Sequence, residues 1–76
     1  MIEVIVFGQL TDIVGREPLR IDEVADTDQL VQVLQQRYPA LSGKPYIIAV
    51  DKEIVDTNTT LTGNNKVALL PPFAGG

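Results

Sequence analysis

Few side chains in this sequence are suited to catalysis, because its 76 residues include no cysteine and no histidine. A chain of this composition has no thiol nucleophile, no imidazole general base, no disulfide and no Cys/His zinc ligand set. Ten acidic residues against six basic ones give a formal net charge of −4. A nucleic-acid surface needs clustered Lys and Arg, so this charge argues against a nucleic-acid partner and favours basic protein partners.

The C-terminal segment is the remaining place for chemistry. Pro71 and Pro72 fix φ and lack N–H groups, so the chain should leave a sheet there in an extended direction. Residues 71–76 reach at most about 20 Å, and Gly75 and Gly76 have no Cβ to obstruct entry into a narrow channel of another protein. A carboxylate at Gly76 would need activation by an ATP-using partner, most simply as an anhydride with AMP. The alternative is that Gly-Gly is a frayed chain end and Pro-Pro only terminates the strand. The residues alone give these two interpretations equal weight.

The rest of the chain must position that segment, and its apolar residues predict mainly strands. Ile2–Phe7 alternates two faces, a short helical turn or loop is expected near residues 10–15, and Leu19–Ile21 should return beside the first strand. A second hairpin is expected from Tyr46–Val50 through a turn at residues 51–53 into Ile54-Val55, with Leu61 tucked under the sheet. The last strand is expected at 66–70, after a turn at Gly63-Asn64-Asn65.

One helix is predicted between these hairpins. Leu30, Val33, Leu34 and Tyr38 recur at helical spacing, Thr27 is the expected N-cap, and Pro39 ends the element. Four acidic residues surround the helix start, but their spacing does not match a calcium loop. They are interpreted as capping residues, and no metal site is predicted.

The order of elements predicts an α+β domain of the ubiquitin-like β-grasp type over residues 1–70, followed by an extended tail over 71–76. One main helix should pack across a single mixed sheet, with the first and last strands as a central parallel pair. No apolar stretch approaches the ~20 residues of a membrane span, and the N-terminus lacks the basic region of a signal peptide. The expected location is cytoplasmic, with no membrane partner.

The ending Val67-Ala68-Leu69-Leu70-Pro71-Pro72-Phe73-Ala74-Gly75-Gly76 resembles that of molybdopterin synthase small subunits, within the MoaD/ThiS group of β-grasp sulfur carriers. The resemblance covers the whole chain, including the first strand and the hairpin around Ala49–Glu53. One departure lies before the last strand, where the family usually has Gly-Asp-Glu and this chain has Asn64-Asn65-Lys66. Asn64 tolerates left-handed geometry, so the turn should survive. Any partner salt bridge made by the family's acids at that turn becomes doubtful.

The resemblance implies a mechanism centred on Gly76. An ATP-dependent activating enzyme would adenylate it, and a sulfur donor would convert the acyl-AMP to a thiocarboxylate. The tail, recognised through Gly75, Ala74 and Phe73, would then enter the large catalytic subunit of molybdopterin synthase and deliver sulfur to a cyclic pterin precursor of the molybdenum cofactor. The small subunit would have no activity alone and no resident cofactor, and the assembly implied is a heterotetramer of two small and two large subunits.

The partner surface is predicted from strand alternation. Val4, Val6, Val67 and Leu69 should face the helix, which leaves Phe7 and Leu70 on the opposite face as an apolar patch beside the tail. The alternative for Phe7 is packing under the connection at residues 10–14, and for Leu70 it is ordinary partial burial. At the level of function, a thiamine-pathway sulfur carrier, a ubiquitin-like modifier of lysines and a binding module with an incidental Gly-Gly are the competing interpretations.

Overall fold

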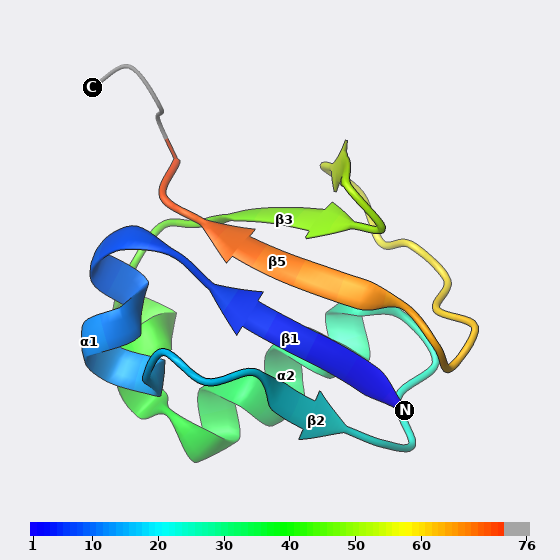
Figure 1. Cartoon of the computed structure of the whole chain (residues 1–76), viewed down its shortest axis with the longest axis horizontal. Helices are drawn as coiled ribbons and strands as arrows, with labels where there is room; N and C mark the ends of the chain where they lie inside the picture. The colour runs from blue at the N-terminus through cyan, green and yellow to red at the C-terminus, as the bar shows by residue number, and fades with distance from the viewer. Residues whose placement is uncertain (73–76) are drawn as a thin grey trace.

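A five-stranded mixed sheet with the strand order β2-β1-β5-β3-β4 frames the protein. The computed structural model describes residues 1–72. Its strands are β1 (Ile2–Val6), β2 (Leu19–Ile21), β3 (Ile47–Val50), β4 (Glu53–Val55) and β5 (Lys66–Leu70). The helical elements are the 3₁₀ turns η1 (Gly8–Leu10) and η2 (Pro39–Gly43), the single turn α1 (Thr11–Val14), and the long helix α2 (Thr27–Arg37). Figure 1 shows this arrangement, which confirms the predicted ubiquitin-like β-grasp fold.

The centre of the sheet is the predicted parallel pair of β1 and β5. Their register places Val4 opposite Val67 and Val6 opposite Leu69. These four side chains are at most 6% exposed and belong to the core, as the alternation predicted. Antiparallel partners flank the pair, with β2 beside β1 and β3 beside β5. Because β1 and β5 run in the same direction, both end at the same edge of the sheet.

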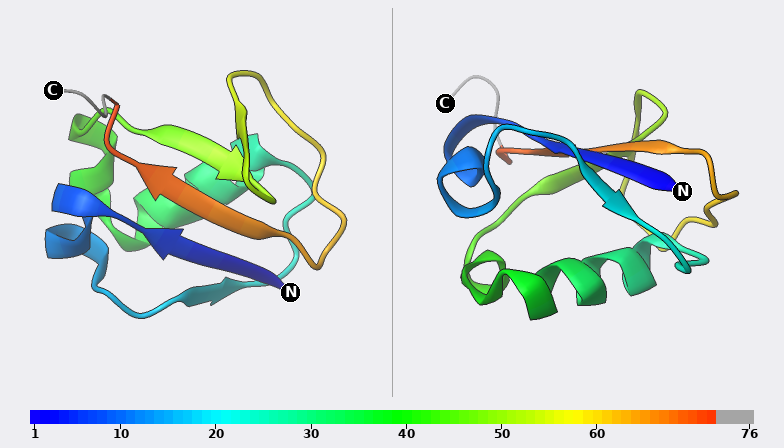
Figure 2. Two further views of the ribbon diagram at one scale, coloured as in Figure 1. Left: turned by 45° about the horizontal axis from the view of Figure 1, so that its top comes forward. Right: turned by 60° about the horizontal axis from the view of Figure 1, so that its bottom comes forward.

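Helix α2 covers one face of the sheet, and Figure 2 shows it running beneath the strands. Leu30 and Leu34 are at most 1% exposed and lie in the core with the inward residues of the strands. Leu61 is 6% exposed in the same core, so its predicted return under the sheet is confirmed. The 3₁₀ turn η2 was not expected, and it adds buried Leu41 to the core.

The N-cap prediction was wrong by one residue. Asp26 has the extended backbone of a cap, and its Oδ1 accepts a hydrogen bond from the Gln29 N–H at 2.9 Å. Thr27 is the first helical residue and is 3% exposed. Its hydroxyl oxygen accepts from the Thr59 N–H at 2.9 Å and so holds the returning loop instead. Asp and Thr are both good N-cap residues. Here the Thr27 hydroxyl bonds the loop at Thr59, and Asp26 caps the helix.

The second hairpin is tighter than predicted. Asp51 and Lys52 alone form the turn, with φ of 48° and 74°, and β4 begins at Glu53. Two successive left-handed residues suit a two-residue hairpin loop, because their twist matches that of the flanking strands. The preceding strand begins at Ile47 rather than Tyr46. In the turn before β5 the left-handed residue is Gly63, with φ of 105°, so Asn64 need not adopt that geometry.

Candidate functional site

The candidate site is the edge of the sheet where β1 and β5 end. The Phe7 N–H donates to the Leu69 carbonyl at 3.0 Å and extends the ladder by one bond beyond β1. The next residues of the other strand are Pro71 and Pro72, which have no N–H to donate. The chain therefore leaves the sheet at this edge, as the sequence predicted, and β1, η1 and the end of β5 meet there (Figure 1).

A groove of about 300 Å³ lies beside this exit. Residues 8–10 form one wall, Lys44 and Pro45 another, and Pro71 and Pro72 complete it. Of these residues Leu10 is buried, whereas Lys44 and Pro45 are exposed. The exit is thus a mostly apolar depression with one cationic side chain on its rim.

The sheet face turned away from α2 is apolar toward the chain exit, whereas the pair Glu3 and Lys66 makes its other end polar. Phe7 is 46% exposed, and Leu70 is half-buried at the next position of the parallel register. Phe7 is not part of the buried core, so complete burial under the connection at residues 10–14 does not occur. That Phe7 and Leu70 bind partners stays a prediction.

Sequence reasoning missed part of this face. Ile47 is directly opposite Leu70, and Ile54 shares the face through its pairing with Ala49. Ile54 is 68% exposed on the edge strand β4. The signal was present in the nearly unbroken apolar run from Tyr46 to Val50, because such a run puts apolar side chains on both faces of a strand. We call the set Ile5, Phe7, Ile47, Ala49, Ile54, Ala68 and Leu70 the outer apolar face.

A polar network closes the opposite end of β5. Asp51 accepts from the Lys66 N–H at 2.9 Å and from the Asn65 side-chain amide at 2.7 Å. The carbonyl oxygen of that amide accepts from the Thr62 N–H at 2.7 Å and from the Thr62 hydroxyl at 3.2 Å. The Lys66 backbone bond, then the Asn65 bond, lowers the pKa of Asp51 below its ordinary value of 3.8. The unusual Asn64-Asn65-Lys66 turn is therefore tied to the β3–β4 hairpin.

The acidic residues around the start of α2 do not assemble into a metal centre. Asp26 caps the helix, and the Asp22 carboxylate lies 3.8 Å from the N-terminal amine, with both groups exposed. Across residues 1–72, no group of three or more Asp, Glu, His or Cys is placed to hold a metal ion. Within the same range, no helix has the length and apolar character needed to cross a membrane.

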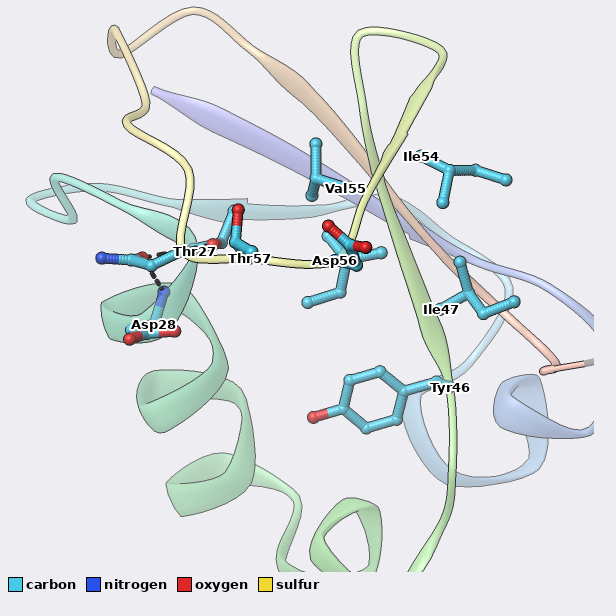
Figure 3. Close-up of a pocket in the computed structure, with 10 residues that line it drawn as sticks. Thr27, Asp28, Tyr46, Ile47, Ile54, Val55, Asp56 and Thr57 are labelled. Carbon is cyan, nitrogen blue, oxygen red and sulfur yellow. Dashed lines mark hydrogen bonds between the residues drawn. The ribbon is translucent and has the colours of Figure 1, made fainter.

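A second cavity, of about 470 Å³, opens between β3, β4 and the first turn of α2 (Figure 3). Tyr46 and Asp56 both line it, and the Tyr46 ring points from the start of β3 toward α2 (Figure 3). The Tyr46 hydroxyl is within hydrogen-bonding distance of the Gln35 amide, at 3.3 Å.

The predicted reactive and tail-recognition residues, Phe73, Ala74, Gly75 and Gly76, lie outside the described residues. The structure brings together Phe7, Leu70, Pro71 and Pro72, at the point from which those residues continue. Fold and exit geometry together define a ubiquitin-like β-grasp domain with an apolar face beside a proline-marked chain exit. Residues 4–76 match the ThiS family, so the chain belongs to that family, in agreement with the resemblance seen in its sequence.

Three curated relatives match over nearly their whole length. The chain is 32% identical to the molybdopterin synthase sulfur carrier subunit of Mycobacterium tuberculosis (strain ATCC 25618 / H37Rv), covering 99% of this chain and 96% of that one. It is 31% identical to the subunit of the same name from Caenorhabditis elegans, with the same two coverages. The subunit of that name from Dictyostelium discoideum is 25% identical, over 97% of this chain and 94% of the relative.

Solved structures agree on the fold. A Pyrococcus furiosus protein described as molybdopterin converting factor, subunit 1, superposes with a TM-score of 0.80 at 19% identity, covering 95% of this chain and 97% of that one. SAMP1 from Haloferax volcanii superposes with a TM-score of 0.78 at 22% identity, covering 99% and 98% of the two chains. At these identities the two structures support the β-grasp architecture and no shared activity.

Proposed function

We propose that this chain is the sulfur-carrier small subunit of a molybdopterin synthase. The observation that carries the proposal is the match to the ThiS family over residues 4–76, joined to three near-full-length relatives that bear this name. The composition is consistent with it, because a chain without cysteine cannot carry sulfur as a cysteine persulfide, whereas an activated carboxyl group can accept sulfur. Gly76 is the proposed carrier residue, because it and Gly75 have no Cβ that would hinder entry into a partner's active site.

The chemistry begins with activation of the Gly76 carboxylate by an ATP-dependent enzyme. A carboxylate oxygen attacks the α-phosphate of ATP, pyrophosphate leaves, and an acyl-AMP anhydride forms. A sulfide-level nucleophile from the sulfur donor then attacks the acyl carbon, a C–S bond forms and AMP leaves. The product is a thiocarboxylate, and both the acyl-AMP and the thiocarboxylate are transient states of this residue.

Delivery takes place in the large subunit. The thiocarboxylated tail enters its active site, and the sulfur forms a C–S bond to the cyclic pterin precursor. Water then hydrolyses the acyl–sulfur bond, which leaves the sulfur on the precursor and regenerates the Gly76 carboxylate. The large subunit supplies the catalytic side chains, so the small subunit is expected to be inactive alone. Two small and two large subunits form the proposed assembly.

The described residues contribute a docking platform for these steps. Phe7 and Leu70 lie beside the chain exit, and with Phe73 they are proposed to anchor the successive partners. Exposed aromatic side chains next to half-buried apolar ones are typical anchors of protein interfaces. Placing the anchors beside the exit lets one docking event both hold the domain and aim the tail.

Reconstitution of the synthase reaction tests this function. The thiocarboxylated chain is mixed with the large subunit and the cyclic pterin precursor, and the dithiolene product is measured. The expected result is product formation in proportion to the thiocarboxylate supplied, with the plain carboxylate form as the inactive control. If the thiocarboxylate forms but gives up sulfur only to a thiamine-pathway acceptor, the chain is the alternative type of carrier. Accumulation of isopeptide bonds between Gly76 and lysines would instead indicate a protein modifier.

A further inference from the structure

We propose that Gly8 is a positioning residue that sets the direction in which the chain leaves β5. Pro71 packs in the space beside the Gly8 backbone, which a side chain of any other amino acid at position 8 would occupy. The inference deepens the proposed function, on which its kinetic part rests, because the direction at Pro71 decides where Gly76 arrives in a partner. Gly8 begins η1 directly after the last ladder bond, and it lines the groove at the exit together with Pro71.

The contact at Gly8 is tight. A Cβ added there would lie 2.6 Å from Pro71 Cγ and 3.4 Å from Pro71 Cδ. The proline ring is closed onto the backbone and can only change its pucker, so it cannot swing clear of the contact as a flexible side chain would. To restore ordinary contact at 3.4 Å, Pro71 would have to move by about 0.8 Å, taking the following residues with it.

Two other glycines show that backbone geometry alone does not explain this requirement. Gly8, Gly15 and Gly63 all have positive φ, at 62°, 102° and 105°. A Cβ at Gly15 or Gly63 would meet nothing within 4 Å. All three positions favour glycine conformationally, but only Gly8 has the proline exit packed against it.

The orientation of Pro71 and Pro72 depends on packing rather than on backbone N–H hydrogen bonds. Pro71 and Pro72 cannot donate to β3 or to the residues after β1, so the ladder gives them no N–H bond. Pro71 is half-buried between the Gly8 backbone and the groove, whereas Pro72 is exposed. The Gly8–Pro71 contact therefore fixes the first step of the exit by shape.

The experiment is a double-mutant cycle of Gly8→Ala and Pro71→Ala, with Gly15→Ala and Gly63→Ala as matched controls. The controls carry the same kind of backbone strain without the steric contact. Pro71→Ala removes Cγ and Cδ and keeps a Cβ, which lies 3.9 Å from the added group. Pyrophosphate release by the activating enzyme gives kcat and KM for each variant as a protein substrate, and thermal melting checks its fold.

The expected result is a loss of kcat/KM by about tenfold to a hundredfold for Gly8→Ala, as for a misplacement of this size. The controls should retain kcat/KM within about threefold. In the Pro71→Ala background, Gly8→Ala should cost less than about threefold, because the clash is gone while the backbone strain is unchanged. An equal loss in both backgrounds, or a loss no larger than that of Gly15→Ala, would overturn the proposal.

A measurement that needs no enzyme separates this inference from the proposed function. In NMR spectra of the unmodified chain, the Gly8 Hα protons should show nuclear Overhauser contacts to the Pro71 ring. Gly8→Ala should shift the resonances of residues 71–74, and Gly15→Ala should leave them in place. If no enzyme activates the chain, the proposed function fails, and this comparison still decides the contact. Absent Overhauser contacts and unmoved resonances would refute it.

Discussion

Replacing Phe7 with alanine should weaken binding to the large subunit while leaving the fold intact. Phe7 is 46% exposed, and it is absent from the core formed by the inward residues of β1, β5 and α2. Its removal opens no cavity in the buried core, so the free energy of unfolding should fall by only about 1 to 1.5 kcal/mol, roughly half the value for a fully buried aromatic side chain. An interfacial aromatic anchor, in contrast, loses its contacts with the partner when it is truncated.

The size of the binding effect follows from the exposed area. An aromatic side chain presents roughly 200 Å² of surface. With 46% of Phe7 exposed, roughly 90 Å² is available for burial by a partner. At about 25 cal/mol per Å² this area corresponds to about 2 kcal/mol. The dissociation constant should therefore rise about 30-fold.

Titration calorimetry with the large subunit measures this change, and Ile54→Ala is the matched control. Ile54 is 68% exposed on the same face but lies on β4, separated from β1 by β5 and β3. Its substitution should change the dissociation constant by less than about threefold, as for a peripheral contact. An unchanged affinity for Phe7→Ala, or loss of its thermal transition, would contradict the assignment of Phe7 as an exposed anchor.

Three further predictions concern the network at Asn65 and the carrier residue. Asn65→Ala removes an acceptor for Thr62 and a donor to Asp51, so the free energy of unfolding should fall by about 2 to 3 kcal/mol. This loss should lower Tm by about 10 °C or more. The control Asn64→Ala, at the exposed neighbouring position, should have little effect. The folded-state pKa of Asp51 is lowered, so its stabilising contribution is present above pH 3.8 and is lost as pH falls through the lowered folded value. The Tm difference between the unmodified chain and Asp51→Asn should accordingly shrink below about pH 4, and a difference independent of pH would refute this linkage. Deleting Gly76 should leave Tm unchanged and abolish adenylation, and retained adenylation would exclude this carboxylate as the site of activation.

Local patterns in the sequence were enough to predict most of the fold. The alternation in β1 and β5 identified their buried faces, and the single amphipathic segment identified α2. The order of elements then left the parallel pairing of first and last strands as the arrangement that places one helix across one sheet. These inferences succeeded because they depend on residues close together in the chain.

Features that depend on distant contacts were not predictable in this way. Asp26 rather than Thr27 caps the helix because the loop near residue 59 takes the threonine hydroxyl. Asn65 reads as a turn residue, yet it joins β5 to a hairpin 14 positions away. The contact between Gly8 and Pro71 forms because the residue that begins η1 after β1 lies against the first residue after β5. In each case the role of the residue depends on a contact with a segment that is distant in the sequence.

Intact-mass spectrometry can show whether this chain carries sulfur on Gly76. The protein is incubated with ATP, the activating enzyme and a sulfur donor in the absence of thiol-reactive reagents, and its mass is measured. We expect one carboxylate oxygen to be replaced by sulfur, and the resulting mass shift to disappear when Gly76 is deleted. A mass that stays at that of the plain carboxylate under these conditions would contradict this expectation.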